Sequence, residues 1–444
     1  MKRSDITQGP GQQLYVKAKQ LIPGGTQLLS KRPEMFLPDQ WPSYYSKAQG
    51  CFVWGLDGKK YCEVSSSGIG ACLLGYADPD VNEAVKRAVD QGNMATLNAP
   101  QEVELAELLC DIHPWAGMVR YARTGGESVA VAVRIARAYT GKDKVVICGY
   151  HGWSDWYIAA NLSADGALDG HLLPGLEPNG VPRPLAGTTL TFRYNQIEQL
   201  EALVAEHGDS LGVIVMEPFR NDEPKGGFLE KVREIATKNN LVLIFDEVSS
   251  GWRYNFGGIH LQLGVEPDIA VFAKSISNGF PMAAIIGRGD VMQAAQKSFI
   301  SSTYWTEAIG PTAALTTIKK MREVSVADHI ARVGTLVQEG WRKIAEKHGL
   351  KIKIEGRPAL THFTLDCGEQ SQALHTLFTQ EMLDRDYLAN VAFYGTYAHT
   401  PQIIDKYLLA LDEAFGVLSN AIKTNDVKKR LRGPVAHTGF SRLT

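Results

Sequence analysis

The sequence predicts an α/β protein in which a mainly parallel β-sheet is wrapped by helices, and two observations lead to this fold class. Short apolar runs alternate with longer helical patterns through the middle of the chain, and these runs are rich in β-branched residues. Continuous runs of this kind are typical of strands that are covered on both faces, as in parallel sheets. The expected strands are 118–122, 144–148, 212–216, 241–245, 269–273 and 283–287.

The two ends of the chain have a different pattern. A helical stretch at about 11–21 precedes a Pro-Gly-Gly turn, and FVWGLDGKKYCEV predicts two short strands joined by a turn at Asp57-Gly58. Near the other end, apolar residues at helical spacing predict a helix packed on a core. These residues are Ile404, Leu408, Leu411, Phe415, Leu418 and Ile422.

The domain organisation follows from this contrast. A chain of 444 residues is too long for one compact core and long enough for two domains. We expect a large α/β domain at 64–315. We expect the segments 1–63 and 316–444 to form a smaller α+β lobe together.

Composition and charge exclude several classes of protein. The net charge is −2, and no basic stripe with interleaved aromatic residues indicates nucleic-acid binding; the cationic run at 428–432 is interpreted as a solvated tail. The six cysteines form no CxxC pair and have no histidines at metal spacing, so neither a metal site nor a disulfide framework is expected. The start, MKRSDITQGPGQQ, lacks an apolar stretch, and no run of about 18 apolar residues occurs. We therefore expect a cytoplasmic protein without a membrane span.

Polar and glycine-rich segments follow the expected strands. Glu217 follows one strand, Asp246 and Glu247 follow the next, and Lys274 follows a third. The segment Arg-Thr-Gly-Gly-Glu at 123–127 follows the first strand and opens a helix. Each of these alone is explained by a solvated strand end. Together they bring a lysine, an acid pair and a glycine-rich helix start to the edge of a parallel sheet where ligands bind.

These groups meet the requirements of pyridoxal phosphate. A helix N-terminus with free amide donors binds anions, so Thr124, Gly125 and Gly126 are predicted to hold the phosphate. A lysine at a desolvated strand end can have a lowered pKa, which lets its neutral amine attack an aldehyde. Pyridoxal chemistry also needs a carboxylate that keeps the ring nitrogen protonated, and Asp246 is the natural candidate.

A family resemblance supports this cofactor. The segments RTGGESVAVAVRIARAYTGKDK, GYHGW, FDEVSSGWR and VFAKSISNGFPMAAIIGR resemble the class-III aminotransferases of fold type I, a family that includes glutamate-1-semialdehyde aminomutase. The likeness extends from the Pro-Gly-Gly turn at 23–25 to AHT at 398–400. It implies that Lys274 carries the cofactor as a Schiff base and shuttles a proton, and that Asp246 pairs with the pyridinium nitrogen.

The resemblance implies further roles. Tyr150 would stack on the cofactor ring, and Glu217 would contact polar groups of the cofactor or substrate. His151 is expected to shape the site rather than take part in the chemistry. Thr303 matches the position that reaches the phosphate of the partner subunit, which implies a homodimer with its active site at the interface.

Three departures from the aminomutase pattern concern the substrate. The mutase has a Pro-Val-Arg stretch that supplies an arginine for the substrate carboxylate, whereas this chain has Leu-Ser-Lys at 29–31 followed by Arg32. Phe-Tyr-Gly at 393–395 lacks the glutamate of the mutase, and Gly126 replaces a usual threonine. Aromatic residues are frequent on the expected substrate side, where they suit a sugar-like ligand as well as plain packing. These are Trp41, Tyr44, Tyr45, Trp153, Trp156 and Trp305.

We therefore expect a ping-pong aminotransferase that moves an amino group from an amino-acid donor, such as glutamate, to a carbonyl substrate, such as a keto- or aldehydo-sugar derivative. The alternative is an intramolecular 2,1-aminomutase of the glutamate-1-semialdehyde type. Two other classes fit less well. Gly68-x-Gly70 lacks the third glycine of a dinucleotide-binding fingerprint. A non-catalytic scaffold would not need both Lys274 and Asp246.

Overall fold

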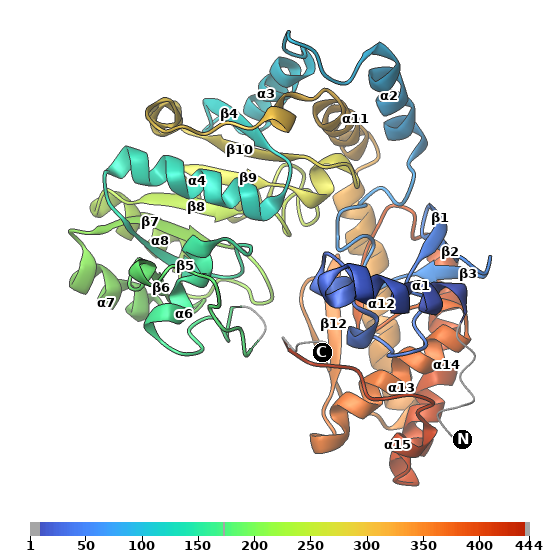
Figure 1. Cartoon of the computed structure of the whole chain (residues 1–444). Helices are drawn as coiled ribbons and strands as arrows, with labels where there is room; N and C mark the ends of the chain where they lie inside the picture. The colour runs from blue at the N-terminus through green and yellow to red at the C-terminus, as the bar shows by residue number, and fades with distance from the viewer. Residues whose placement is uncertain (1–8, 172–173, 440–444) are drawn as a thin grey trace. The chain divides into compact units, whose positions relative to one another are not determined.

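The computed structural model describes residues 9–171 and 174–439, which divide into two compact units (Figure 1). The large unit is formed by residues 79–327, and the small unit by residues 1–78 together with 328–444. The segment MKRSDITQGPGQQ, which lacks an apolar stretch in the sequence, lies largely outside the described residues. In the described part, no helix combines the length and apolar character needed to cross a membrane.

The large unit is built on one sheet, which has seven strands within the described residues. In sheet order these are β4 (Met118–Ala122), β10 (Ala283–Gly287), β9 (Ile269–Phe272), β8 (Val242–Asp246), β7 (Leu211–Met216), β5 (Lys144–Cys148) and β6 (Thr189–Thr191). All six expected runs form strands. Only β10 runs against the others, since it pairs antiparallel with both β4 and β9. The short strand β6 was not expected from the sequence.

Helices cover both faces of this sheet. Alternate residues of the strands, such as Val145 and Ile244, pack against α4 (Gly125–Thr140) on one face. The residues between them, such as Val146 and Phe245, pack against α7 (Ile197–His207) and α8 (Phe228–Lys238) on the other face. The expectation of strands buried on both sides is therefore confirmed.

The other helices of the large unit complete its surface. A separate layer consists of α11 packed against α2 and α3. The bounds are α2 (Pro79–Gln91), α3 (Gln101–Ile112), α5 (Asp155–Ile158), α6 (Ala160–Ser163), α9 (Ile259–Leu263), α10 (Gly289–Met292) and α11 (Ile309–Glu323).

The small unit joins both ends of the chain, blue and red in Figure 1. Its described strands form one sheet of β1 (Tyr45–Gln49), β2 (Phe52–Gly55), β3 (Lys60–Glu63) and β13 (Tyr387–Leu388), and another of β11 (Ile352–Glu355), β12 (Leu360–Leu365) and β14 (Ala392–Tyr394). Its helices are α1 (Pro10–Leu21), α12 (Val326–His348), α13 (Ser371–Asp384), α14 (Pro401–Lys423) and α15 (Val427–Arg430). The expected hairpin is present as β2 and β3.

The core of the small unit confirms the apolar stripe expected near the C-terminal end. Phe415 of α14 lies 5.7 Å, between ring centroids, from Phe363 of β12, which also contacts Trp341 and Phe378. The basic segment beyond α14 is partly engaged in ion pairs. Arg432 donates through both terminal nitrogens to Asp384, each at 2.7 Å, so it is not simply a solvated tail residue.

The boundaries between the two units lie at 78/79 and 327/328, whereas the sequence predicted them at 63/64 and 315/316. The segment 64–78 stays with the small unit because Val64 accepts a hydrogen bond from the backbone of Tyr394, and the Ser67 hydroxyl donates to the Tyr394 carbonyl. Helix α11 stays with the large unit because it packs on α2 and α3.

Candidate active site

Side chains from separate strands meet at the carboxyl edge of the large sheet. Thr124 follows β4, Tyr150 follows β5 and Glu217 follows β7, while Asp246 is the last residue of β8 and Lys274 follows β9. These five strands run in one direction, so their carboxyl ends lie along one edge. The structure thus brings together the strand-end residues that the sequence singled out.

Lys274 lies at the turn after β9 with a left-handed backbone (φ 48°). Its Nζ donates a hydrogen bond to the Ser249 hydroxyl at 2.7 Å. Desolvation lowers the pKa of Lys274, and the nearby carboxylates of Asp246 and Glu217 oppose this shift only in part. A lowered pKa increases the neutral amine, which is the form that attacks an aldehyde. No sequence pattern singles out Ser249, which is a short polar residue within a turn.

The Asp246 carboxylate is buried and held by two donors. The His151 Nδ1–H donates to Oδ2 at 2.8 Å, and the backbone N–H of Val248 donates to Oδ1 at 3.0 Å. Both side chains are almost fully buried. A carboxylate fixed in this way can stabilise a positive charge on a ring nitrogen placed beside it. His151 therefore acts on the site by orienting Asp246.

The N-terminus of α4 leaves backbone donors available for an anion. Thr124 is the N-cap, and the Glu127 carboxylate accepts the N–H groups of Arg123 at 2.8 Å and Thr124 at 3.3 Å. The Thr124 side chain in turn faces the N–H of Glu127 in a capping box. The N–H groups of Gly125 and Gly126 have no partner within the helix because they belong to its first turn. They fit a phosphate group.

A close contact between two backbones explains why residue 152 is a glycine. A Cβ atom on Gly152, which has a φ of 103°, would lie 2.7 Å from the Cα of Gly126. A Cβ on Gly126 would lie 3.4 Å from Gly152 and 3.5 Å from the Trp153 ring. The loop after β5 therefore lies directly on the first turn of α4.

Tyr150 and Glu217 are joined through the same loop. The Tyr150 N–H donates to the Glu217 Oε2 at 3.1 Å, and a Cβ on Gly149 would lie 2.5 Å from that oxygen. Burial raises the pKa of Glu217, while Arg220, with Nη1 at 3.4 Å, acts in the opposite direction. Tyr150 remains 41% exposed and is therefore accessible for stacking.

Thr303 begins a short 3-10 helix (Thr303–Thr306) and its side chain is exposed. The segment is anchored by Glu307, whose carboxylate pairs with the Arg123 Nε at 2.8 Å and accepts the first N–H groups of α11. Because Arg123 directly precedes Thr124, the same ion pair ties this segment to the start of α4.

The aromatic residues expected on the substrate side divide between the units. Trp153, Trp156 and Trp305 line, together with Thr124, a cavity of about 560 Å³ in the large unit. The other three belong to the small unit, where Trp41 stacks on Phe36 with 4.7 Å between ring centroids.

Glu247, the second member of the acid pair, does not join Asp246. It is buried and accepts hydrogen bonds from the His260 Nδ1 at 2.8 Å and from the Ser250 hydroxyl. Trp115 donates to the other nitrogen of His260 at 3.1 Å. Glu247 is therefore part of a structural network inside the large unit.

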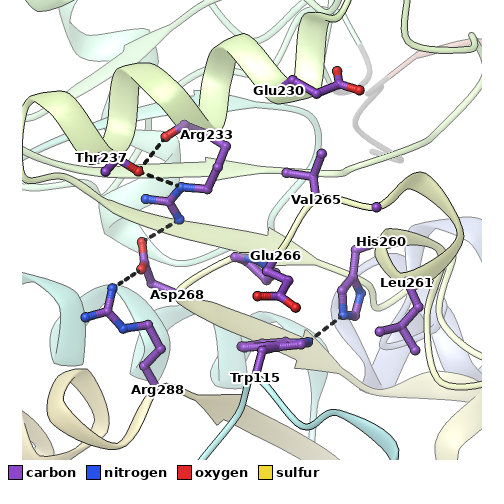
Figure 2. Close-up of a pocket in the computed structure, with 12 residues that line it drawn as sticks. Trp115, Glu230, Arg233, Thr237, His260, Leu261, Val265, Glu266, Asp268 and Arg288 are labelled. Carbon is purple, nitrogen blue, oxygen red and sulfur yellow. Dashed lines mark hydrogen bonds and ion pairs between the residues drawn. The ribbon is translucent and has the colours of Figure 1, made fainter.

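A second large cavity, of about 640 Å³, lies next to this network at the start of β9. Figure 2 shows Arg233 and Arg288 converging on Asp268, whose carboxylate they contact at 2.9 Å each. Asp268 also accepts the backbone N–H of Leu243. This cavity is at the opposite edge of the sheet from Lys274, and its charged groups fix β8, β9 and α8 to one another.

The contact between Gly126 and Gly152 leads to a prediction. Gly152→Ala should displace the loop from α4, lower the melting temperature and weaken binding of pyridoxal phosphate at least tenfold. Gly180→Ala is the matched control, because its φ is 84° but nothing lies within 4 Å of its Cβ position, so it carries only the left-handed backbone cost of about 1–2 kcal/mol. Thermal unfolding and fluorescence titration with the cofactor measure both effects. Equal losses in the two variants would contradict the proposed contact.

Known proteins resemble this chain over most of its length. A 3-aminobutyryl-CoA aminotransferase from Cloacimonas acidaminovorans is 29% identical over 413 residues, covering 90% of this chain and 95% of the relative. A glutamate-1-semialdehyde 2,1-aminomutase from Heliobacterium modesticaldum is 32% identical over 436 residues, covering 92% and 97%. The fold matches that of the Sphingopyxis sp. MTA144 FumI protein in its PLP internal aldimine form, with a TM-score of 0.84, 21% identity and coverage of 94% and 98%.

The family model for class-III aminotransferases matches residues 38–383. This range contains every strand-end residue of the candidate site and the whole of the large unit. The chain therefore belongs to the class-III aminotransferases, and it is a pyridoxal-phosphate-dependent enzyme of fold type I.

Proposed function

We propose that this enzyme transfers an amino group between two separate small molecules in a ping-pong reaction. The donor is an amino acid such as glutamate, and the acceptor is a carbonyl compound, with a keto- or aldehydo-sugar derivative as the candidate. The observation that carries the proposal is the partly desolvated Lys274 amine beside the oriented Asp246 carboxylate. These are the two groups that amino transfer requires of the protein.

Each strand-end residue has a role in this proposal. Lys274 binds the cofactor aldehyde and then moves a proton at its Nζ, with Ser249 as its hydrogen-bond partner. Asp246, oriented by His151, stabilises the protonated ring nitrogen. The first turn of α4 holds the phosphate, and Tyr150 covers the ring. Bound in this way, pyridoxal phosphate would withdraw electrons from the substrate carbon next to the nitrogen.

Two features of the small unit support transfer between separate molecules over isomerisation within one. Residues 29–31 form a short 3-10 helix in place of the mutase arginine. Arg32 packs on the Pro-Gly-Gly turn, because a Cβ on Gly24 would lie 2.4 Å from its terminal nitrogen. The aromatic cavity beside Thr124 supports a flat, hydroxyl-rich acceptor such as a sugar.

We also propose a homodimer in which Thr303 contacts the phosphate bound by the partner subunit. Large apolar side chains of the large unit are strongly exposed, which supports a surface that is covered in an assembly. Leu97 is 83% exposed and Phe299 is 90% exposed. Tyr304, next to Thr303, is 70% exposed.

The proposed location is the cytoplasm. All six cysteines lie in the described part of the chain, and all are free thiols. Free thiols are typical of proteins in a reducing compartment.

The role of Lys274 is tested by covalent trapping. Borohydride reduction of the holoenzyme should attach the cofactor irreversibly at Lys274, as located by peptide mapping. Lys274→Ala should lose more than the roughly 10²–10⁴-fold expected for a general base alone, because it also removes the covalent role. Lys231→Ala, which changes an exposed lysine of α8, is the matched control. A label on another lysine would refute the assignment.

Isotope transfer distinguishes the transaminase from the mutase. With nitrogen-15 glutamate as donor, the label should appear in the product of a carbonyl acceptor, because the amino group moves between molecules. Glutamate-1-semialdehyde should be a poor substrate, since its carboxylate would lack an aligned arginine. Mass spectrometry of the products measures the label. Efficient isomerisation of the semialdehyde without uptake of label would restore the mutase.

Mixed dimers test the shared site. Lys274→Ala chains and Thr303→Ala chains should each be inactive, and subunit exchange should restore part of the activity, since one of the two sites in the hybrid is free of both changes. Activity is measured before and after mixing, with exchange followed by mass-tagged chains. Demonstrated exchange without recovery would mean that each site is built by one chain.

A further inference from the structure

A cavity of about 300 Å³ lies beside the proposed cofactor site, at the carboxyl ends of β5, β6 and β7. We propose that it is a subsite for an anionic group of the substrate, a carboxylate or a phosphate, and that Arg220 is its main binding residue. The inference deepens the proposed aminotransferase function and rests on it. A volume of this size is at the small end of ligand pockets, so it suits an oxyanion with a few carbon atoms.

Glu217 is the wall shared by this cavity and the cofactor site. Its Oε2 accepts the N–H of Tyr150 at 3.1 Å and lies 3.4 Å from the Arg220 Nη1. The charge of Arg220 also contributes to lowering the pKa of Lys274, so the guanidinium is within electrostatic reach of that amine. The cavity therefore adjoins the groups that surround Lys274, with Glu217 between them.

Arg220 is held in place through its Nη1, by a hydrogen bond and an ion pair, and keeps other donors available. Its Nη1 donates to the backbone carbonyl of His171 at 2.8 Å, which fixes the direction of the guanidinium. Among the described residues, neither Nε nor Nη2 is hydrogen-bonded to a protein acceptor, and the side chain is 46% exposed. A fixed guanidinium with free donors is suited to two-point binding of a carboxylate or phosphate.

Two further groups lining the cavity add donors. The Arg193 side chain packs over Gly170, where a Cβ would lie 2.3 Å from its Nη1. His171 is buried and its Nδ1 accepts the N–H of Gly149 at 3.1 Å, so the proton of the neutral ring is on Nε2. Burial, together with the charges of His151, Arg193 and Arg220, lowers the pKa of His171 to about 4. At neutral pH this ring is therefore an uncharged donor.

The acidic groups of the cavity do not balance these donors. Glu217 already accepts the Tyr150 N–H and pairs with Arg220. Burial also raises the pKa of Glu217, which favours its uncharged form. Asp222 is the other carboxylate of the lining, and it is exposed. Two guanidinium groups and an N–H donor thus face a cavity with one exposed carboxylate, which favours an anion as the ligand.

The binding test uses the cofactor-loaded enzyme with glutarate and inorganic phosphate as probes, so that the two arms distinguish a carboxylate from a phosphate ligand. Arg220→Gln should raise the Kd of the bound probe about 10- to 100-fold, as expected for loss of a charged hydrogen-bonding partner. Arg220→Lys keeps the charge without the planar fork and should have an intermediate Kd. Arg183→Gln, at an exposed position outside the cavity, is the matched control and should leave the Kd unchanged.

Calorimetric titration measures the Kd without turnover, so its result does not depend on the substrate assignment. Failure of the wild-type enzyme to bind either probe, or equal Kd values in Arg220→Gln and Arg183→Gln, would overturn the subsite. A changed pH dependence of the cofactor's visible absorbance, with unchanged probe affinity, would overturn it as well, because Arg220 would then act on the cofactor. Loss of the nitrogen-15 transfer in the wild type would instead count against the proposed function.

Discussion

The covering of the large sheet on both faces is the constraint on which the site depends. Alternate strand residues are buried under α4 on one side and under α7 and α8 on the other, and the strand backbones are paired along the sheet. Polar side chains can then be placed only at the strand ends. Because five strands run in one direction, the ends of β4, β5, β7, β8 and β9 supply one edge with a lysine, two carboxylates, a tyrosine and a helix N-terminus. The rigid sheet fixes their relative positions.

The chemistry of this edge depends on opposing electrostatic effects. Desolvation lowers the pKa of Lys274 and raises that of Glu217, so burial moves both groups toward their neutral forms. Two N–H donors hold the Asp246 carboxylate in a fixed orientation. Glycine positions make this arrangement possible, since the loop after β5 passes against α4 at Gly126 and against Glu217 at Gly149. The loop after β5 therefore contacts both the Glu217 carboxyl group and the backbone of the first turn of α4.

The sequence predicted the features that depend on periodicity and on the ends of strands, and missed those that depend on packing in three dimensions. Strands of β-branched residues were predictable, whereas β6 has only three residues and the antiparallel direction of β10 leaves no local signal. Asp246 and Glu247 look equivalent in sequence. In the structure the two residues make separate contacts, Asp246 with His151 and Glu247 with His260. Ser249 could not be selected, because only the fold brings it to Lys274. Arg220 lies three residues after Glu217, so its ion pair with that carboxylate was within reach of a local argument from the sequence.

The small unit is assembled from both ends of the chain, and this has a consequence for protein synthesis. Cys62 of β3 pairs with Tyr387 of β13, and Ser65 is hydrogen-bonded to residues 390 and 392. The intervening large unit spans residues 79–327, so at about 5–20 residues per second roughly 10–50 s separate the two halves of the small unit on the ribosome. The large unit can fold as soon as it is complete. The N-terminal segment, with apolar residues such as Val64 that are buried in the finished protein, must wait unpaired, and in that interval its apolar surface is open to aggregation.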